Sequence, residues 1–90
     1  MRKKVLLSKV ATKEFNKLQK ASKKQVKSAL EKLSESELRF RLDVKRLKGV
    51  GGREDLFRLR VGDYRIIFSE DEDSLKVTQI IHRGKGYAWL

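Results

Sequence analysis

The dipeptide Gly-Asp at 62–63 lies between two stretches in which apolar residues occupy every second position, residues 56–61 and residues 64–69. Alternation with a period of two is typical of a strand buried on one face, and Gly-Asp is a turn sequence. A two-residue loop between strands forms a β-hairpin and sets its register. The pattern therefore predicts a hairpin in which Val61 lies opposite Tyr64.

This register sorts the hairpin side chains onto two faces, because successive residues of a strand point to opposite sides. The apolar residues share one face: Phe57, Leu59, Val61, Tyr64, Ile66 and Phe68. The other face carries Arg58, Arg60 and Arg65, with Arg60 directly opposite Arg65. Like charges in opposite positions destabilise a sheet. Guanidinium groups bind phosphate oxygens bidentately, so this face is predicted to bind a polyanion.

An alternative explanation is that acidic side chains fold over the three arginines and neutralise them. The candidates are Glu54, Asp55 and Asp63. We favour the polyanion, because a sequence chosen for stability alone would place Glu or Thr opposite Arg60.

A third alternating run at residues 75–82 follows the acidic turn at residues 70–73. Pairing with the second strand across a four-residue loop would place Arg65 opposite Ile80 and His82 on the side of the arginines. A lone histidine is more often structural than catalytic. Its place at the end of a strand beside a basic face makes it a candidate site residue.

The first third of the chain predicts one short strand, at residues 5–7, and two amphipathic helices behind it. Ser8 and Ser22 are the candidate N-caps of the two helices. Apolar residues recur at i, i+4 and i+7 in each helix: Ala11, Phe15 and Leu18, then Val26, Leu30 and Leu33. Each helix can therefore cover a sheet with one side.

The order of the elements predicts an α+β fold, an antiparallel sheet of about four strands with both helices packed on one face. Residues 38–47 fit a strand and a helical turn equally well, and the glycines within residues 48–54 predict a flexible loop. A chain of this length supports one domain, over residues 1–90.

The formal net charge of +11 favours polyanionic partners, with nucleic acid the first candidate. The helical lysines can also be an ordinary solvated surface. The absence of cysteine excludes disulfides and thiolate zinc sites, and a single histidine excludes multi-histidine metal sites. No apolar run approaches the roughly 18 residues of a membrane span. We therefore expect a soluble, cytoplasmic domain with no membrane partner.

The last eight residues combine Arg83 and Lys85 with Tyr87 and Trp89. Cations interleaved with aromatic rings suit single-stranded nucleic acid, because phosphates pair with the cations and bases stack on the rings. The alternative is that a ring completes the small core, which we favour for Trp89 but not for Tyr87.

Three segments in this order resemble the RelE/ParE superfamily of toxins from toxin–antitoxin modules. They are Lys48-Gly49, the run from Leu56 to Phe68, and Ile81-His82-Arg83 followed by Tyr87. With the two lysine-rich helices ahead of them, the resemblance covers nearly the whole chain. The His-Arg-x-x-x-Tyr ending is closer to RelE than to the gyrase-inhibiting ParE toxins.

The resemblance implies a RelE-like mRNA endonuclease that works in the ribosomal A site without a metal or cofactor. In such toxins the ribose 2′-hydroxyl attacks the adjacent phosphate and leaves a cyclic phosphate and a free 5′-hydroxyl. The resemblance also implies a hetero-oligomer with a RelB-like antitoxin that is acidic or amphipathic.

Residue by residue, the resemblance implies that Arg65 and Arg83 hold the scissile phosphate and that Tyr87 orients a base. The implied RNA-binding residues are Arg58, Arg60, Lys48 and Lys85. RelE toxins have lysines at the positions of Arg58 and Arg60, and arginine stays protonated, so neither is a general base. His82 and Tyr87 remain as donors of a proton to the leaving oxygen, and imidazole ordinarily titrates near neutral pH.

Two other functions are consistent with the sequence. The first is a ParE-like toxin that inhibits DNA gyrase by binding, without nuclease chemistry. The second is an inactive homologue that binds RNA or the ribosome through its basic surface, which the exchange of lysine for arginine leaves open.

Overall fold

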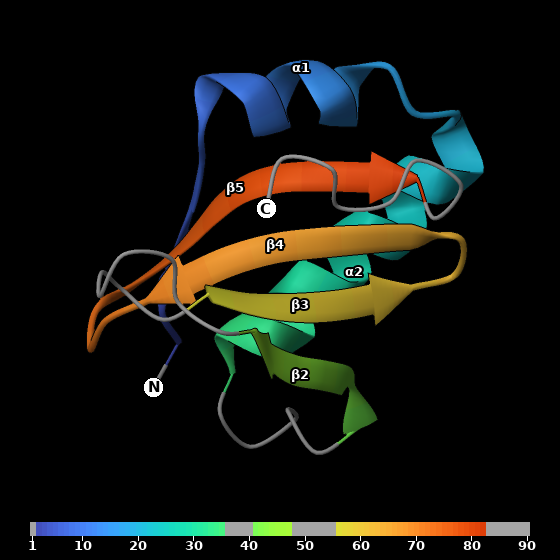
Figure 1. The fold of residues 1–90 in the computed structure, drawn as a ribbon. Helices are drawn as coiled ribbons and strands as arrows, with labels where there is room; N and C mark the ends of the chain where they lie inside the picture. The colour runs from blue at the N-terminus through green and yellow to red at the C-terminus, as the bar shows by residue number, and fades with distance from the viewer. Residues whose placement is uncertain (1, 36–40, 48–55, 83–90) are drawn as a thin grey trace.

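The computed structural model of the chain describes residues 2–35, 41–47 and 56–82, which form a mixed sheet and two helices (Figure 1). The strands are β1 Lys4–Leu7, β2 Asp43–Leu47, β3 Leu56–Val61, β4 Tyr64–Glu70 and β5 Ser74–His82. The helices are α1 Lys9–Asn16 and α2 Lys20–Ser34. The strand order is β1-β5-β4-β3-β2. The predicted α+β class is confirmed.

The β3–β4 hairpin has the register that its two-residue loop predicts. Val61 lies opposite Tyr64, and Arg60 lies opposite Arg65. Gly62 has a φ of +55°, in the left-handed region that glycine adopts without steric cost. The local turn chemistry therefore determines which side chains of β3 and β4 share a face.

The two edge strands differ from the expectation. The sheet has five strands rather than about four, because residues 43–47 of the ambiguous segment pair with β3 as β2. At the other edge β1 pairs with β5 in parallel, so the sheet is not wholly antiparallel. Both strands are short, and a short run carries too little alternation to predict its partner. The predicted loop at residues 48–54 lies outside the described residues.

The start of α1 is confirmed, and the start of α2 is corrected. Ser8 Oγ accepts a hydrogen bond from the Ala11 amide at 3.0 Å and caps α1. The N-cap of α2 is Gln19, so the prediction of Ser22 was wrong. The Lys23 amide donates to the Gln19 carbonyl at 2.9 Å, which closes a helical turn across the position of Ser22.

The two helices hold different places against the sheet. Figure 1 shows α2 crossing one face, whereas α1 lies beside the outer edge of β5, so the expected packing of both helices on one face is corrected for α1. Beyond the end of β1, Glu14 Oε1 accepts a hydrogen bond from the Ile80 amide at 3.0 Å. A helical side chain thus satisfies a strand donor that β1 does not reach. Neither of these two helices is long and apolar enough to cross a membrane.

The core lies between α2 and the sheet, and Ala11 of α1 also belongs to it. The helix contributes Val26, Ala29, Leu30 and Leu33. The sheet contributes Leu59, Ile66, Phe68, Leu75, Val77 and Ile80. The six apolar hairpin residues predicted to share a face all lie in this core or pack against it. The three hairpin arginines therefore lie on the face turned away from α2.

Candidate nucleic-acid interface

Arg58 and Arg60 of β3 and Arg65 of β4 form a surface that we call the arginine face. It is the side of the sheet toward the viewer in Figure 1, with α2 behind. Ile67 lies opposite Arg58 and Ile81 lies opposite Arg65, and both isoleucines are buried. The arginine face therefore sets cationic side chains around an apolar centre, as the strand alternation predicts.

Asp43 of β2 partly neutralises this face. Its carboxylate accepts a hydrogen bond from Arg58 Nη2 at 2.9 Å, and its second oxygen lies 3.6 Å from Arg60 Nε. The Arg58 side chain is only 12% exposed, whereas that of Arg60 is 49% exposed. Arg58 is thus held mainly inside the protein, and Arg60 is the more accessible of the two.

The sequence did not point to Asp43 as the carboxylate beside these arginines. Its strand was ambiguous, and a residue can be placed opposite another only after the strand is assigned. Of the three carboxylates considered, Glu54 and Asp55 lie outside the described residues, and Asp63 lies in the hairpin turn.

Arg65 differs from the two arginines of β3. Its side chain is half-buried, and Nη1 donates to the carbonyl oxygen of Tyr64 at 3.4 Å. Within the described residues no carboxylate forms an ion pair with it. The guanidinium of Arg65 is therefore the member of the arginine face best able to take an anionic ligand as its counter-charge.

A β-bulge changes the position of His82. Between Glu70 and Phe68, β4 pairs with β5 in the register that the predicted four-residue loop sets. Thr78 is then an extra residue in β5 with no paired residue on β4. As a result, Arg65 lies opposite Ile81 rather than Ile80. His82 lies opposite Tyr64, and their rings meet edge-on with centroids 5.3 Å apart. The predicted placement of His82 with the arginines is wrong, because one inserted residue reverses every later side chain.

Hydrogen bonds to β4 and to Ser8, the N-cap of α1, hold the bulge. Thr78 Oγ1 donates to the Ile67 carbonyl at 3.1 Å, and Ser8 Oγ donates to the Thr78 carbonyl at 2.8 Å. The residue that caps α1 thus also binds the inserted residue of β5. The start of the first helix and the side-chain direction of the last strand are therefore linked.

Four predicted site residues lie outside the described residues: Lys48, Arg83, Lys85 and Tyr87. Their roles stay predictions. Within the described ranges, no three His, Cys, Asp or Glu side chains gather in a way that could hold a metal ion.

A sheet backed by one helix, edged by a second and cationic on the face turned away from the first helix defines a class of small basic α+β domains. The sequence profile described as "ParE toxin of type II toxin-antitoxin system, parDE" matches residues 5–87. The chain belongs to this family and is a toxin of a type II toxin–antitoxin system. The resemblance to the RelE/ParE superfamily is thereby confirmed.

Solved structures support the same superfamily. The chain is 30% identical to a chain of the archaeal RelE–RelB complex from Pyrococcus horikoshii OT3, with a TM-score of 0.77, covering 96% of this chain and 100% of that one. The RelB–RelE antitoxin–toxin complex from Methanococcus jannaschii matches with 26% identity, a TM-score of 0.70, and coverage of 94% and 98%. The YoeB dimer from Staphylococcus aureus, at 20% identity, TM-score 0.61 and coverage of 88% and 94%, shares the fold. No curated protein matches the chain.

Proposed function

We propose that this toxin is a ribosome-dependent mRNA endonuclease that acts through the arginine face. The observation that carries the proposal is the half-buried Arg65, which lies opposite Arg60 and has no carboxylate partner among the described residues. Such a pair is unfavourable in the free protein and becomes favourable when a phosphate lies over it. Two RelE structures at 30% and 26% identity support the RelE-like reading.

In this proposal the ribose 2′-hydroxyl passes its proton to solvent as its oxygen attacks the adjacent phosphorus, and the bond from phosphorus to the 5′-oxygen breaks. The products are a 2′,3′-cyclic phosphate and a 5′-hydroxyl. Arg65 and Arg83 stabilise the negative charge that develops on the non-bridging oxygens. Arg60 and Arg58, with Lys48 and Lys85, bind the flanking RNA backbone. Tyr87 orients a base beside the cut.

The leaving 5′-oxygen needs a proton, and its donor has to be close to the scissile phosphate. The arginines stay protonated and are poor donors. Since His82 lies on the α2 side of β5, Tyr87 is the proton donor that we propose. Without a strong base in the site, the ribosome has to supply the geometry of the mRNA, and positioning alone can contribute roughly 7–11 kcal/mol.

We further propose that a cognate antitoxin, acidic or amphipathic, holds the toxin inactive in a hetero-oligomer in the cytoplasm. The two RelE matches come from complexes that contain RelB. A net charge of +11 gives such a partner a strong electrostatic attraction.

Inhibition of DNA gyrase is the second candidate, because the matching family profile is that of ParE toxins. The two functions predict different products. Expression without antitoxin, followed by mapping of mRNA 5′ ends, should reveal new cuts for the nuclease. Gyrase inhibition should instead trap gyrase–DNA complexes and leave mRNA intact.

The decisive control is purified protein with naked mRNA and with programmed ribosomes. We expect cleavage only with ribosomes. Intact mRNA in cells whose growth has stopped would reject the nuclease, and rapid cleavage of naked mRNA would reject the requirement for the ribosome.

A further inference from the structure

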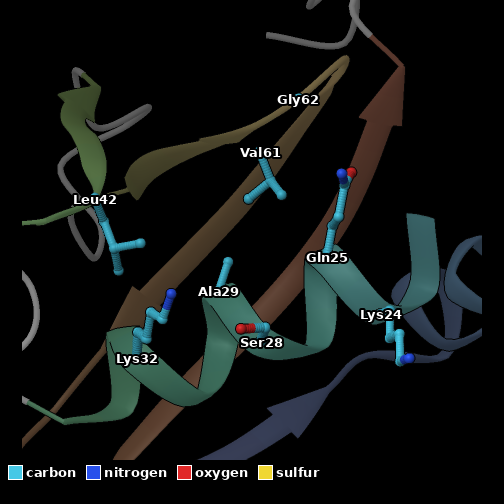
Figure 2. A pocket seen from close by; sticks show the side chains of 8 residues that line it. All are labelled: Lys24, Gln25, Ser28, Ala29, Lys32, Leu42, Val61 and Gly62. Atoms are coloured by element: carbon cyan, nitrogen blue, oxygen red, sulfur yellow. The ribbon is translucent and has the colours of Figure 1, made fainter. Parts of the chain in front are cut away.

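The edge strand β2 carries a lysine that none of the roles proposed above uses. Lys45 lies opposite Arg58 of β3, and residues that pair across antiparallel strands point to the same side of a sheet. The alternate residues Leu42 and Val44 pack against the core, and Figure 2 shows Leu42 directed toward the hollow between α2 and the hairpin. Lys45 therefore lies on the same side of the sheet as the arginine face.

Lys45 is the more accessible cation of its cross-strand pair. It is exposed, whereas the side chain of Arg58 is only 12% exposed and donates a hydrogen bond to Asp43. No carboxylate in the described ranges forms an ion pair with Lys45. The positive charge that an anionic ligand can reach at this pair is therefore mainly that of Lys45.

Four cations form an oblique row across three strands. Arg65 of β4 lies opposite Arg60 of β3. Lys45 of β2 lies opposite Arg58, two residues before Arg60 on β3. With ordinary strand geometry, Lys45 stands about 10 Å from Arg65 across the sheet and about 7 Å from it along the strands. This separation suits two different phosphates of one backbone better than a single phosphate.

Asp43 makes the oblique path more favourable than a straight one. It lies opposite Arg60, in the same cross-strand row as Arg65. Its carboxylate would repel a phosphate backbone that continued along this row to the edge of the sheet. Lys45 lies two residues further along β2, where a phosphate meets an attractive charge instead. The charges on β2 therefore favour a backbone that turns from Arg65 toward Lys45.

We propose that Lys45 binds a phosphate that flanks the scissile one and so sets the direction in which RNA crosses the arginine face. The inference rests on the proposed function, which places the scissile phosphate at Arg65. The ammonium group of Lys45 is a compact charge with three donors, and it pairs with a phosphate oxygen without taking part in bond making or breaking. It contributes to affinity for RNA and not to the rate of the chemical step.

The test is the affinity of the full-length toxin for a single-stranded 2′-O-methyl oligonucleotide, which cannot be cleaved. K45Q removes the charge of Lys45, and K45R keeps it. The matched control K24Q removes one charge from Lys24 of α2, which is exposed and which Figure 2 shows pointing away from the sheet. Thermal melts should show all three variants folded.

We expect K45Q to bind about fivefold more weakly than the wild type, as for the loss of one exposed ion pair, and K24Q less than about twofold more weakly. K45R should keep about half of the affinity or more. The logarithmic salt dependence of binding should become shallower by about 0.7 in K45Q and stay unchanged in K24Q. A lysine with a merely structural role would not change this slope.

Uncharged linkages locate the phosphate that Lys45 binds. A methylphosphonate placed at each position of the oligonucleotide in turn should weaken binding of the wild type at several linkages. K45Q should be insensitive at one of them, because the partner of that phosphate is already lost. Arg65→Ala should become insensitive at a different linkage. Insensitivity of both variants at the same linkage would contradict the oblique path.

Steady-state cleavage on programmed ribosomes separates this inference from the proposed function. K45Q should raise KM about fivefold and change kcat less than about twofold, whereas Arg65→Ala should lower kcat. Failure of the wild type to cleave would reject the nuclease, and the affinity for the oligonucleotide would still decide the role of Lys45. Equal affinity of K45Q and the wild type, equal weakening in K45Q and K24Q, or no measurable binding by the wild type would overturn that role.

Discussion

Arg60 and Arg65 lie directly opposite each other on β3 and β4, on the face of the sheet turned away from α2. Arg60 Nε lies 3.6 Å from a carboxylate oxygen of Asp43, and Arg65 has no such partner in the part of the chain that the structure describes. The repulsion between these two like charges destabilises the free toxin, and a bound phosphate would relieve it.

Replacement of Arg65 by Ala should separate activity from stability. Loss of one preorganised charge-stabilising donor costs about 3–4 kcal/mol, so mRNA cleavage on ribosomes should fall by about a hundredfold or more. Melting temperature should hold or rise, because repulsion with Arg60 is relieved. Full toxicity of the variant, or its failure to fold, would contradict the assignment of the site.

The Asp43→Asn variant tests whether Asp43 acts as the counter-charge of the arginine face. Binding to a non-cleavable 2′-O-methyl oligonucleotide should tighten, and its logarithmic salt dependence should steepen by about 0.7 for each guanidinium freed. Stability should also fall, by more than the roughly 1 kcal/mol of an exposed ion pair, because Arg58 is mostly buried and loses its charged partner. Glu72→Gln removes one exposed charge elsewhere and is the matched control. Equal effects of the two substitutions would mean that Asp43 acts only through net charge.

Replacement of His82 by Gln tests the corrected register. Because His82 lies on the side of Tyr64 rather than with Arg65, ribosome-dependent cleavage should change less than about threefold, where a true general acid contributes about a hundredfold or more. The pH dependence of cleavage between pH 5.5 and 8 should be the same for both proteins, as expected of a residue that transfers no proton. A loss of about a hundredfold or more would restore His82 as the proton donor.

Asp71 should make the stability of the β4–β5 turn depend on pH. Hydrogen bonds from the backbone amides of Ser74 and Asp73 and from the Ser74 hydroxyl lower the pKa of its carboxyl below the ordinary 3.8. A lowered pKa in the folded state contributes stability above pH 3.8 that is lost as the pH falls through the folded value.

Melting curves of the wild type and the Asp71→Ala variant between pH 7 and pH 2 check this. The variant should melt lower at pH 7, and the difference should shrink once the pH drops below 3.8. Glu72→Ala, in the same turn, should show no such pH-dependent difference.

Much of the arginine face follows from local sequence. A two-residue turn with a glycine at φ +55° leaves one register for β3 and β4. Alternation then places Arg58, Arg60 and Arg65 on one side. No distant part of the chain is needed for this result, because the turn and the strand pleat act over a few residues.

The carboxylate partner of these arginines could be identified only from the tertiary structure. Asp43 reaches Arg58 and Arg60 only because β2 pairs with β3, and the short, polar β2 has little pattern of its own. Asp43 and Arg58 are neighbours only because these two strands pair, and the local sequence does not determine which strands pair.

The sequence alone determined the hairpin register and the two amphipathic helices, because each of these depends on neighbours within about one turn or one strand. Length and net charge are also properties of the sequence alone. The place of α1 beside β5 and the direction of His82 were decided by the tertiary structure. Ser8 binds the bulged Thr78, and Glu14 binds the Ile80 amide, across 70 and 66 residues of chain. The contact of Ser8 holds the bulge after which the side chains of β5 change face, and no local periodicity encodes that bulge.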